Sequence, residues 1–349
     1  MSQPSPADLD LLGKRLLVVS GKGGVGKTVL SSALALLGAR RGKNVLLVKI
    51  DDQGRTAQLF GTPPLGDEIR PLREGISAVN LDPKTVAFEF ILRQLKVRRL
   101  ARHIVDSNLF EAWFRVSPAI KEMIVLGKVW SLVEERSWWR KQPTWDLVVF
   151  DAPATGHGLG LLRLPEQASK LLIGPLRTSA LAVQSLLLDA AQTNLVLVTI
   201  PEEMPVTEAI HFHEQARRVL RMPLACLVLN GVFPDYLPGQ DGLPGQDGQD
   251  GQDGQDGGVE AALGAGSGRS ALQALGVDPQ LDLTPALRYA RERAGLTARY
   301  RAELSDKIDL PLLEVPFLFS EQFGFRELER VAKHLEQALR LPPPGEAAA

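Results

Sequence analysis

Short apolar runs, each bounded by glycine, proline or polar residues, recur along the chain and predict buried parallel strands. They lie at 15–20 (RLLVVS), 44–50 (NVLLVKI), 145–151 (WDLVVFD), 194–200 (NLVLVTI), 223–230 (PLACLVLN) and 310–316 (LPLLEVP). After the first run, VLSSALALLGARRG is apolar at helical spacing and closes at Gly42. Strand, helix and strand within about 35 residues form a βαβ unit. The pattern therefore predicts an α/β fold with a doubly wound, mostly parallel sheet.

A helical insertion is predicted between the second and third strands, at about 82–140. Residues 82–103 read as one helix, opened by Asp82 as the N-cap with Pro83 at the first helical position. A second helix is expected from 117 to 136, and the segment 62–80, rich in proline and glycine, is expected to be irregular. About 60 residues exceed what one crossover helix needs, so these helices form a subdomain. Further helices are expected at about 206–221 and 321–340.

One domain accounts for residues 14–341 of the 349-residue chain, with tails at 1–13, a polar and disordered segment, and 342–349. Between 239 and 257 glycine recurs at every third residue, the period of collagen. The run is short and lacks regular proline. We therefore expect a flexible acidic surface loop at about 236–270.

Amino-acid composition limits the possible cellular locations and classes of partner. The chain has 40 basic and 41 acidic residues, a net charge of −1, which argues against a general nucleic-acid binder. No stretch approaches the ~18 apolar residues of a membrane span, and the first ten residues lack the features of a secretory signal. The single cysteine, Cys226, excludes an intrachain disulfide and a Cys-Cys zinc site within one chain. A cytoplasmic location is therefore predicted.

A phosphate-binding loop is the most specific local motif. GKGGVGKT at 21–28 fits G-x-x-x-x-G-K-[ST], follows a buried strand and opens a helix. Its backbone N–H groups and the helix N-terminus would bind phosphates, Lys27 would reach the β- and γ-phosphates, and Thr28 would offer a hydroxyl to Mg²⁺. ATP and Mg²⁺ are the predicted cofactors. The predicted nucleotide-binding residues here are Gly21, Lys22, Gly23, Gly24, Val25, Gly26, Lys27, Thr28 and Val29.

Lys22 makes the loop resemble the "deviant" Walker A class, because the general motif does not require a lysine at its second position. This class includes the positioning ATPases of the MinD/ParA type, the nitrogenase iron protein and the arsenite-pump ATPases. The resemblance implies a homodimer in which Lys22 acts catalytically on the partner's nucleotide, as an arginine finger does.

A second segment narrows the resemblance. FDAPATGHGLGLLRLP at 150–165 resembles the signature of the arsenite-translocating ATPase (ArsA) and tail-anchored-protein-targeting ATPase family. The resemblance implies that Asp151, at the end of its strand, holds Mg²⁺ through water. It also places His157 at the family's switch histidine, between two glycines that allow the loop to change shape.

Further matches to this family fall in the right order. IDDQGRTAQLFG at 50–61 places Asp51 at the switch aspartate that orients the attacking water and lies close to the metal. Asp52-Gln53-Gly54 departs from the family's Pro-Ala-His. The resemblance also places Asn230 at the adenine-reading asparagine, with Pro316 and Phe317 near the base.

The sequence thus predicts an ATP-hydrolysing homodimeric switch that couples its nucleotide state to a protein client, with a membrane-protein segment as one candidate. No zinc is expected, because the Cys-x-x-Cys of the targeting branch is missing. Two alternatives stay open: a positioning ATPase on membrane or DNA, and a nucleotide-binding scaffold with little hydrolysis. The basic run RQLKVRRLARH at 93–103 could contact an anionic membrane, although a solvated helix face is the commoner origin of such runs.

Overall fold

An eight-stranded sheet forms the centre of the protein, in the order β3-β4-β2-β5-β1-β6-β7-β8. The computed structural model describes residues 9–50, 52–116, 118–137, 142–153, 164–166, 169–170, 174–233 and 284–341. Neighbouring strands pair in parallel, except for the antiparallel pair β3 and β4 at one edge. The α/β fold with a doubly wound, mostly parallel sheet is therefore confirmed. The strands are β1 (Leu16–Gly21), β2 (Val45–Ile50), β3 (Arg70–Arg73), β4 (Ile76–Leu81), β5 (Leu147–Asp151), β6 (Thr193–Thr199), β7 (Leu224–Val232) and β8 (Leu312–Pro316).

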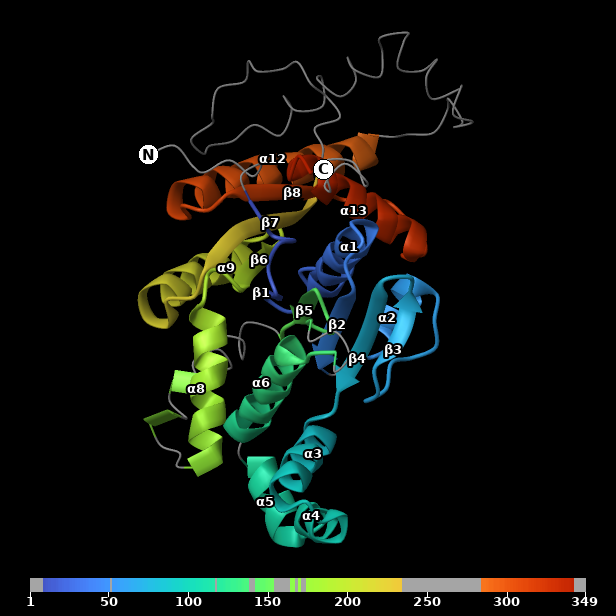
Figure 1. The fold of residues 1–349 in the computed structure, drawn as a ribbon. Helices are drawn as coiled ribbons and strands as arrows, with labels where there is room; N and C mark the ends of the chain where they lie inside the picture. The colour runs from blue at the N-terminus through green and yellow to red at the C-terminus, as the bar shows by residue number, and fades with distance from the viewer. Residues whose placement is uncertain are drawn as a thin grey trace.

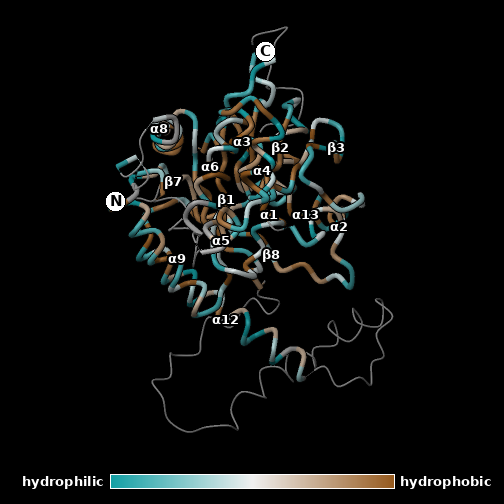
Figure 2. The backbone as a smooth tube through the Cα atoms, turned by 90° about the horizontal axis from the view of Figure 1, so that it is seen from below, coloured by the Kyte–Doolittle hydropathy of each residue, from teal (hydrophilic) through white to brown (hydrophobic). Residues whose placement is uncertain are grey.

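Helices cover both faces of this sheet (Figure 1). One core lies under α1 (Lys27–Arg40), α2 (Arg55–Phe60) and α13 (Phe325–Ala338). The other lies under α6 (Pro118–Glu134), α8 (Gly174–Leu188), α9 (Glu203–Gln215) and α12 (Thr284–Lys307). Successive residues of β1 alternate between the two cores, which is why its sequence is a continuous apolar run. Figure 2 shows hydrophobic segments gathered at the centre of the view and hydrophilic ones toward its outline.

The prediction of an irregular segment at 62–80 is wrong in its second half, where β3 and β4 form an antiparallel pair. β4 also pairs in parallel with β2 along its whole length. Its residues Ile76, Ala78 and Val79 are buried. The proline and glycine residues that suggested a loop lie outside β4 and end at Gly75, so they mark its boundary instead.

The prediction of a single helix at 82–103 is also wrong. The chain forms α3 (Pro83–Leu95) and α4 (Arg98–Val105), separated at Lys96, whose φ of 56° is left-handed. The Lys96 N–H donates to the carbonyl of Leu92 and so closes α3. The Asp82 cap is confirmed, because its carboxylate accepts a hydrogen bond of 2.7 Å from the Thr85 N–H. With α5 (Asn108–Val116), these helices project beyond the sheet in Figure 1.

Other predicted segments differ in detail from the structure or lie outside the described residues. The helix expected at 206–221 forms as α9 followed by a π-helical turn, Ala216–Leu220. Leu11 and Leu12, within the predicted N-terminal tail, are buried beside α1. The predicted Gly-Gln-Asp loop, the switch residues Asp51 and His157, and the tail 342–349 lie outside the described residues. Within the part of the chain that the structure describes, no helix combines the length and the apolar character needed to cross a membrane.

Candidate functional site

The predicted phosphate-binding residues, 21–29, form the end of β1, the following loop and the first turn of α1. Gly24 and Gly26 have φ values of 87° and 92°, which non-glycine residues rarely adopt. A Cβ atom on Gly26 would lie 2.3 Å from Nδ2 of Asn230. The loop therefore bends back on itself before α1 begins, which brings the positive end of that helix to the site.

The Lys27 ammonium lies against the inner side of this loop. Its Nζ donates hydrogen bonds to the carbonyl oxygens of Gly21, at 2.9 Å, and Lys22, at 2.8 Å. Burial lowers the pKa of Lys27, and the nearby Lys49 lowers it further, whereas Asp151 opposes the shift. The side chain is thus held at the loop by neutral carbonyl groups, which leave its charge available to an anion.

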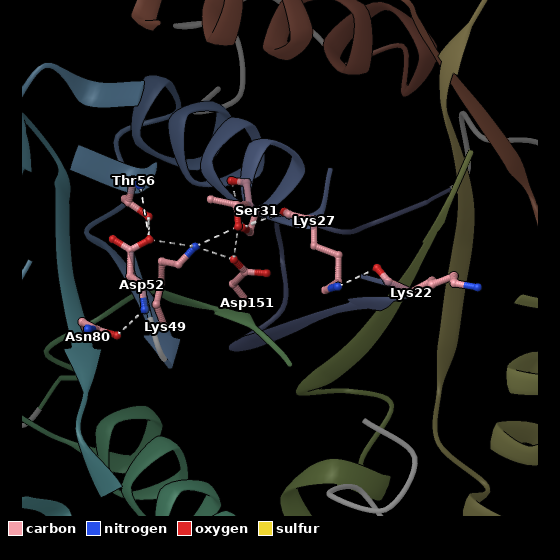
Figure 3. A network of polar contacts seen from close by, with 9 residues as sticks. Lys22, Lys27, Ser31, Lys49, Asp52, Thr56, Asn80 and Asp151 are labelled. Atoms are coloured by element: carbon pink, nitrogen blue, oxygen red, sulfur yellow. Dashed lines mark hydrogen bonds and ion pairs between the residues drawn. The ribbon is translucent and has the colours of Figure 1, made fainter. Parts of the chain in front are cut away.

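Thr28 and Asp151 lie side by side, as the predicted metal site requires. The Thr28 hydroxyl donates to Oδ2 of Asp151 at 2.8 Å. A third group, missed by the sequence reasoning, joins them: Nζ of Lys49 lies 2.9 Å from Oγ1 of Thr28 and 2.6 Å from Oδ2 of Asp151 (Figure 3). Lys49 belongs to the buried run of β2, and its charge within that apolar run was the signal that could have revealed it.

Asp52 completes this cluster from the chain that follows β2. Its Oδ1 lies 3.5 Å from Nζ of Lys49, and the Asp52 side chain is 2% exposed. The same oxygen accepts hydrogen bonds from the N–H and the hydroxyl of Thr56, while the Asp52 N–H donates to Oδ1 of Asn80 at 3.0 Å. The residue that departs from the family pattern is therefore anchored to β4, α2 and Lys49.

The pair Thr28 and Asp151 has the donor chemistry for Mg²⁺, but Lys49 occupies it. Mg²⁺ binds oxygen at about 2.1 Å, and Lys49 lies 2.9 Å from the Thr28 oxygen, so an ion on that hydroxyl would lie within about 5 Å of the ammonium. At that separation a divalent ion and the ammonium would repel each other and would compete for the Asp151 carboxylate. The pair does not fit Mg²⁺ while the ammonium holds this position.

Two cavities meet at the start of α1. One, of about 250 Å³, is lined by the charged cluster and by Gln53 and Pro153. The other, of about 280 Å³, lies over Gly24, Gly26 and Phe323. Lys27, Thr28 and Arg55 line both. Arg55 is an exposed cation at the N-terminus of α2 that no motif singled out. Together the cavities offer an anion two lysines and an arginine.

The predicted base-recognition residues lie together at the ends of β7 and β8. Asn230 pairs with Val315 in the sheet, and its Nδ2 donates to the carbonyl of Val25 at 2.9 Å. Pro316 ends β8, and the Phe317 N–H donates to the carbonyl of Val232 at 2.8 Å. Phe317 is 41% exposed, and its ring stacks on Phe233 with 4.7 Å between centroids. Asn230 thus contacts the phosphate loop directly, with an exposed aromatic ring nearby.

Lys22 points away from the charged cluster in Figure 3. Its Nζ forms an ion pair of 2.8 Å with Glu208 on α9, and the Lys22 side chain is 28% exposed. It therefore belongs to the outer surface of the loop, unlike Lys27.

The chain is similar in sequence to known ATPases. The family described as anion-transporting ATPase matches residues 14–178. ATPase BagA of Mycobacterium tuberculosis is 30% identical over 318 residues, which make up 88% of each chain. The arsenical pump-driving ATPase of Acidiphilium multivorum is 30% identical over 239 residues, 63% of this chain and 40% of the relative. ATPase GET3C of Arabidopsis thaliana is 24% identical over 269 residues, 63% of this chain and 68% of the relative.

Proposed function

Because the chain belongs to the anion-transporting ATPase family of the ArsA type, and is accordingly a nucleotide-binding ATPase, we propose that it acts as a homodimeric switch. In this proposal the nucleotide state controls the binding of a protein client in the cytoplasm. The observation that carries it is the 2.8 Å hydrogen bond from Thr28 to Asp151. This bond joins the phosphate site to the end of β5, so a change at the γ-phosphate reaches the chain that follows Asp151.

The phosphate loop holds the triphosphate in this proposal. The N–H groups of residues 21–29 and Lys27 bind the phosphates, and Arg55 adds a charge from α2. Asp51 orients the attacking water. Asn230, Pro316 and Phe317 contact the adenine base. Thr28, Asp51 and Asp151 have oxygen atoms suited to Mg²⁺. Because Lys49 contacts Thr28 and Asp151, the proposed cycle relies on the protein's own cations to bind the phosphates.

Lys22 gives the dimer its function in this proposal. It leaves Glu208 when two copies close and contacts the partner's nucleotide, where its charge stabilises phosphoryl transfer. An exposed ion pair of this kind costs little to break, on the order of 1 kcal/mol or less. The test mixes Lys22→Ala subunits with Lys27→Ala subunits. Restored ATP hydrolysis in the mixture supports action across the dimer, and an inactive mixture refutes it.

The proposed client surface is a cavity of about 260 Å³ between α3, α6 and α8. Phe90, Met123, Ile124 and Trp130 line it. Aromatic rings and a flexible methionine suit apolar side chains of variable shape, such as those on one face of a membrane-protein span.

Co-purification from the native host tests this surface. Tagged wild type is compared with Asp51→Asn, which is expected to retain ATP and the closed dimer. Apolar clients should be enriched with Asp51→Asn and lost when Phe90→Glu is added. Leu296→Glu, a matched change at an exposed leucine on α12, should leave them bound. Equal recovery with Phe90→Glu and Leu296→Glu would remove the client role from this cavity.

A membrane-associated ATPase is the second candidate, and one surface favours it. Residues 93–100, from the end of α3 into α4, are all exposed and contain Arg93, Lys96, Arg98 and Arg99 with no acidic residue. Leu100 is 46% exposed among them. Each basic residue near an anionic bilayer contributes about 1 kcal/mol. Sedimentation with phosphatidylglycerol vesicles tests it: binding that Arg98→Glu/Arg99→Glu abolishes would favour this role, and no binding would exclude it.

A further inference from the structure

Lys49 is an unusual group to find at the bottom of a phosphate site. Its side chain is 4% exposed, at the end of β2, and three oxygens from separate parts of the chain surround its ammonium. Thr28 and Asp151 lie within 2.9 Å, and Asp52 lies at 3.5 Å. A buried charge of this kind requires such partners, and their convergence fixes the position of the ammonium.

The donor geometry leaves Lys49 able to bind a ligand. An ammonium has three N–H donors. The Thr28 and Asp151 oxygens take two of them at hydrogen-bond distance, whereas Asp52 at 3.5 Å is an ion-pair partner beyond the usual hydrogen-bond range. Lys49 also lines the cavity of about 250 Å³ that Lys27 and Arg55 border. A phosphate oxygen in that cavity would compete with Asp52 for the third donor.

We propose that the Lys49 ammonium is the resident cation of this nucleotide site and contacts the ATP phosphates in place of a divalent metal, so that ATP binds without Mg²⁺. This inference rests on the proposed assignment of the cavity to ATP. It follows from the position of the charge. Lys49 contacts Thr28, which the motif assigns to the metal, and Asp151, which the family resemblance assigns to it, and its charge repels an ion there. Lys27 and Lys49 then act together, one at the loop carbonyls and the other at the acidic pair.

Calorimetric titration with ATP tests the proposal, in excess EDTA and in excess MgCl₂. The wild-type dissociation constant should agree between the two conditions within about threefold. Lys49→Met should bind ATP at least about tenfold more weakly in EDTA, because one charged contact to phosphate is lost. MgCl₂ should restore most of that loss, since removal of the ammonium opens Thr28 and Asp151 to the ion.

Two controls accompany the titration. Lys84→Met removes a lysine from an exposed ion pair with Glu111 and should bind ATP as the wild type does in both conditions. Lys49→Met/Asp52→Asn removes one buried charge of each sign, so it keeps the charge balance if Lys49→Met alone does not fold. It should show the same dependence on Mg²⁺ as Lys49→Met.

The outcomes distinguish failure of the proposed role of Lys49 from failure of the assignment of the site to ATP. A wild type that binds ATP in MgCl₂ but loses more than about threefold in affinity in EDTA overturns the inference and leaves the ATP site intact. In that case Mg²⁺ displaces the Lys49 ammonium from Thr28 and Asp151. A wild type that binds no ATP in either condition overturns the assignment of the site to ATP, and the inference with it.

Discussion

Gly26→Ala tests how the phosphate loop is built, and Gly24→Ala is its matched control. Both glycines have left-handed φ values, of 92° and 87°. Their surroundings differ: a Cβ on Gly26 would lie 2.3 Å from Nδ2 of Asn230, whereas a Cβ on Gly24 would meet nothing within 4 Å. The two substitutions therefore share the backbone cost, and only the first displaces Asn230.

The expected magnitudes follow from these contacts. A left-handed alanine costs about 1–2 kcal/mol in either position. Displacing Asn230 also breaks its 2.9 Å hydrogen bond to the Val25 carbonyl, which adds about 1 kcal/mol. We expect Gly24→Ala to lower the free energy of unfolding by about 1–2 kcal/mol and Gly26→Ala by about 2–3 kcal/mol. Urea unfolding followed by circular dichroism measures both.

A double variant identifies the source of the difference. Adding Asn230→Ala to Gly26→Ala removes the atom that the new Cβ meets, so the Gly26→Ala cost in that background should fall to the Gly24→Ala value. Equal destabilisation by the two single alanine variants would refute the reasoning. So would a cost of Gly26→Ala that Asn230→Ala leaves unchanged, because the contact between loop and β7 would then carry no energy.

Three further predictions concern separate features. Arg55→Ala should weaken ATP binding by about tenfold or more, whereas Gln58→Ala, in the same cavity wall, should not; titration with ATP measures both. Burial raises the pKa of Cys226 to about 12, so the thiol should resist Ellman's reagent at pH 8 in the folded protein and react once urea unfolds it. Lys96→Gly should raise the free energy of unfolding by about 0.5–1 kcal/mol, because Lys96 holds a left-handed φ of 56° at the end of α3; unchanged urea unfolding would contradict this.

Local pattern predicted the sheet well and the insertion poorly, for a physical reason. Strands buried on both faces leave continuous apolar runs, and those at 15–20 and 44–50 formed β1 and β2 with shifts of one residue. The pair β3 and β4 did not stand out, because β3 is an edge strand with one buried residue, Leu72. The break between α3 and α4 depends on one backbone angle at Lys96, where neither glycine nor proline marks the end of a helix.

The candidate site was also predicted only in part. The phosphate loop is contiguous, so the motif at 21–28 predicted eight neighbouring residues at once. The contacts of Lys49 and Lys22 join positions far apart in the chain, such as Lys49 with Asp151 and Lys22 with Glu208. Such pairs follow from the strand order, in which β2 lies beside β5, and β1 lies beside β6, the strand that precedes α9. No local pattern gives that order.

Charge balance explains why an aspartate, Asp52, is present where the family pattern has proline. A lysine beside Thr28 and Asp151 brings a buried ammonium near the partly buried Lys27, and one carboxylate does not balance two cations. Asp52 supplies the second carboxylate 3.5 Å from Lys49, at the position where the family pattern has proline. Asp52 is also tied to Thr56 and Asn80, so the charge that balances Lys49 orients the start of α2 as well. Any movement of Lys49 toward a phosphate would therefore loosen Asp52 and the start of α2.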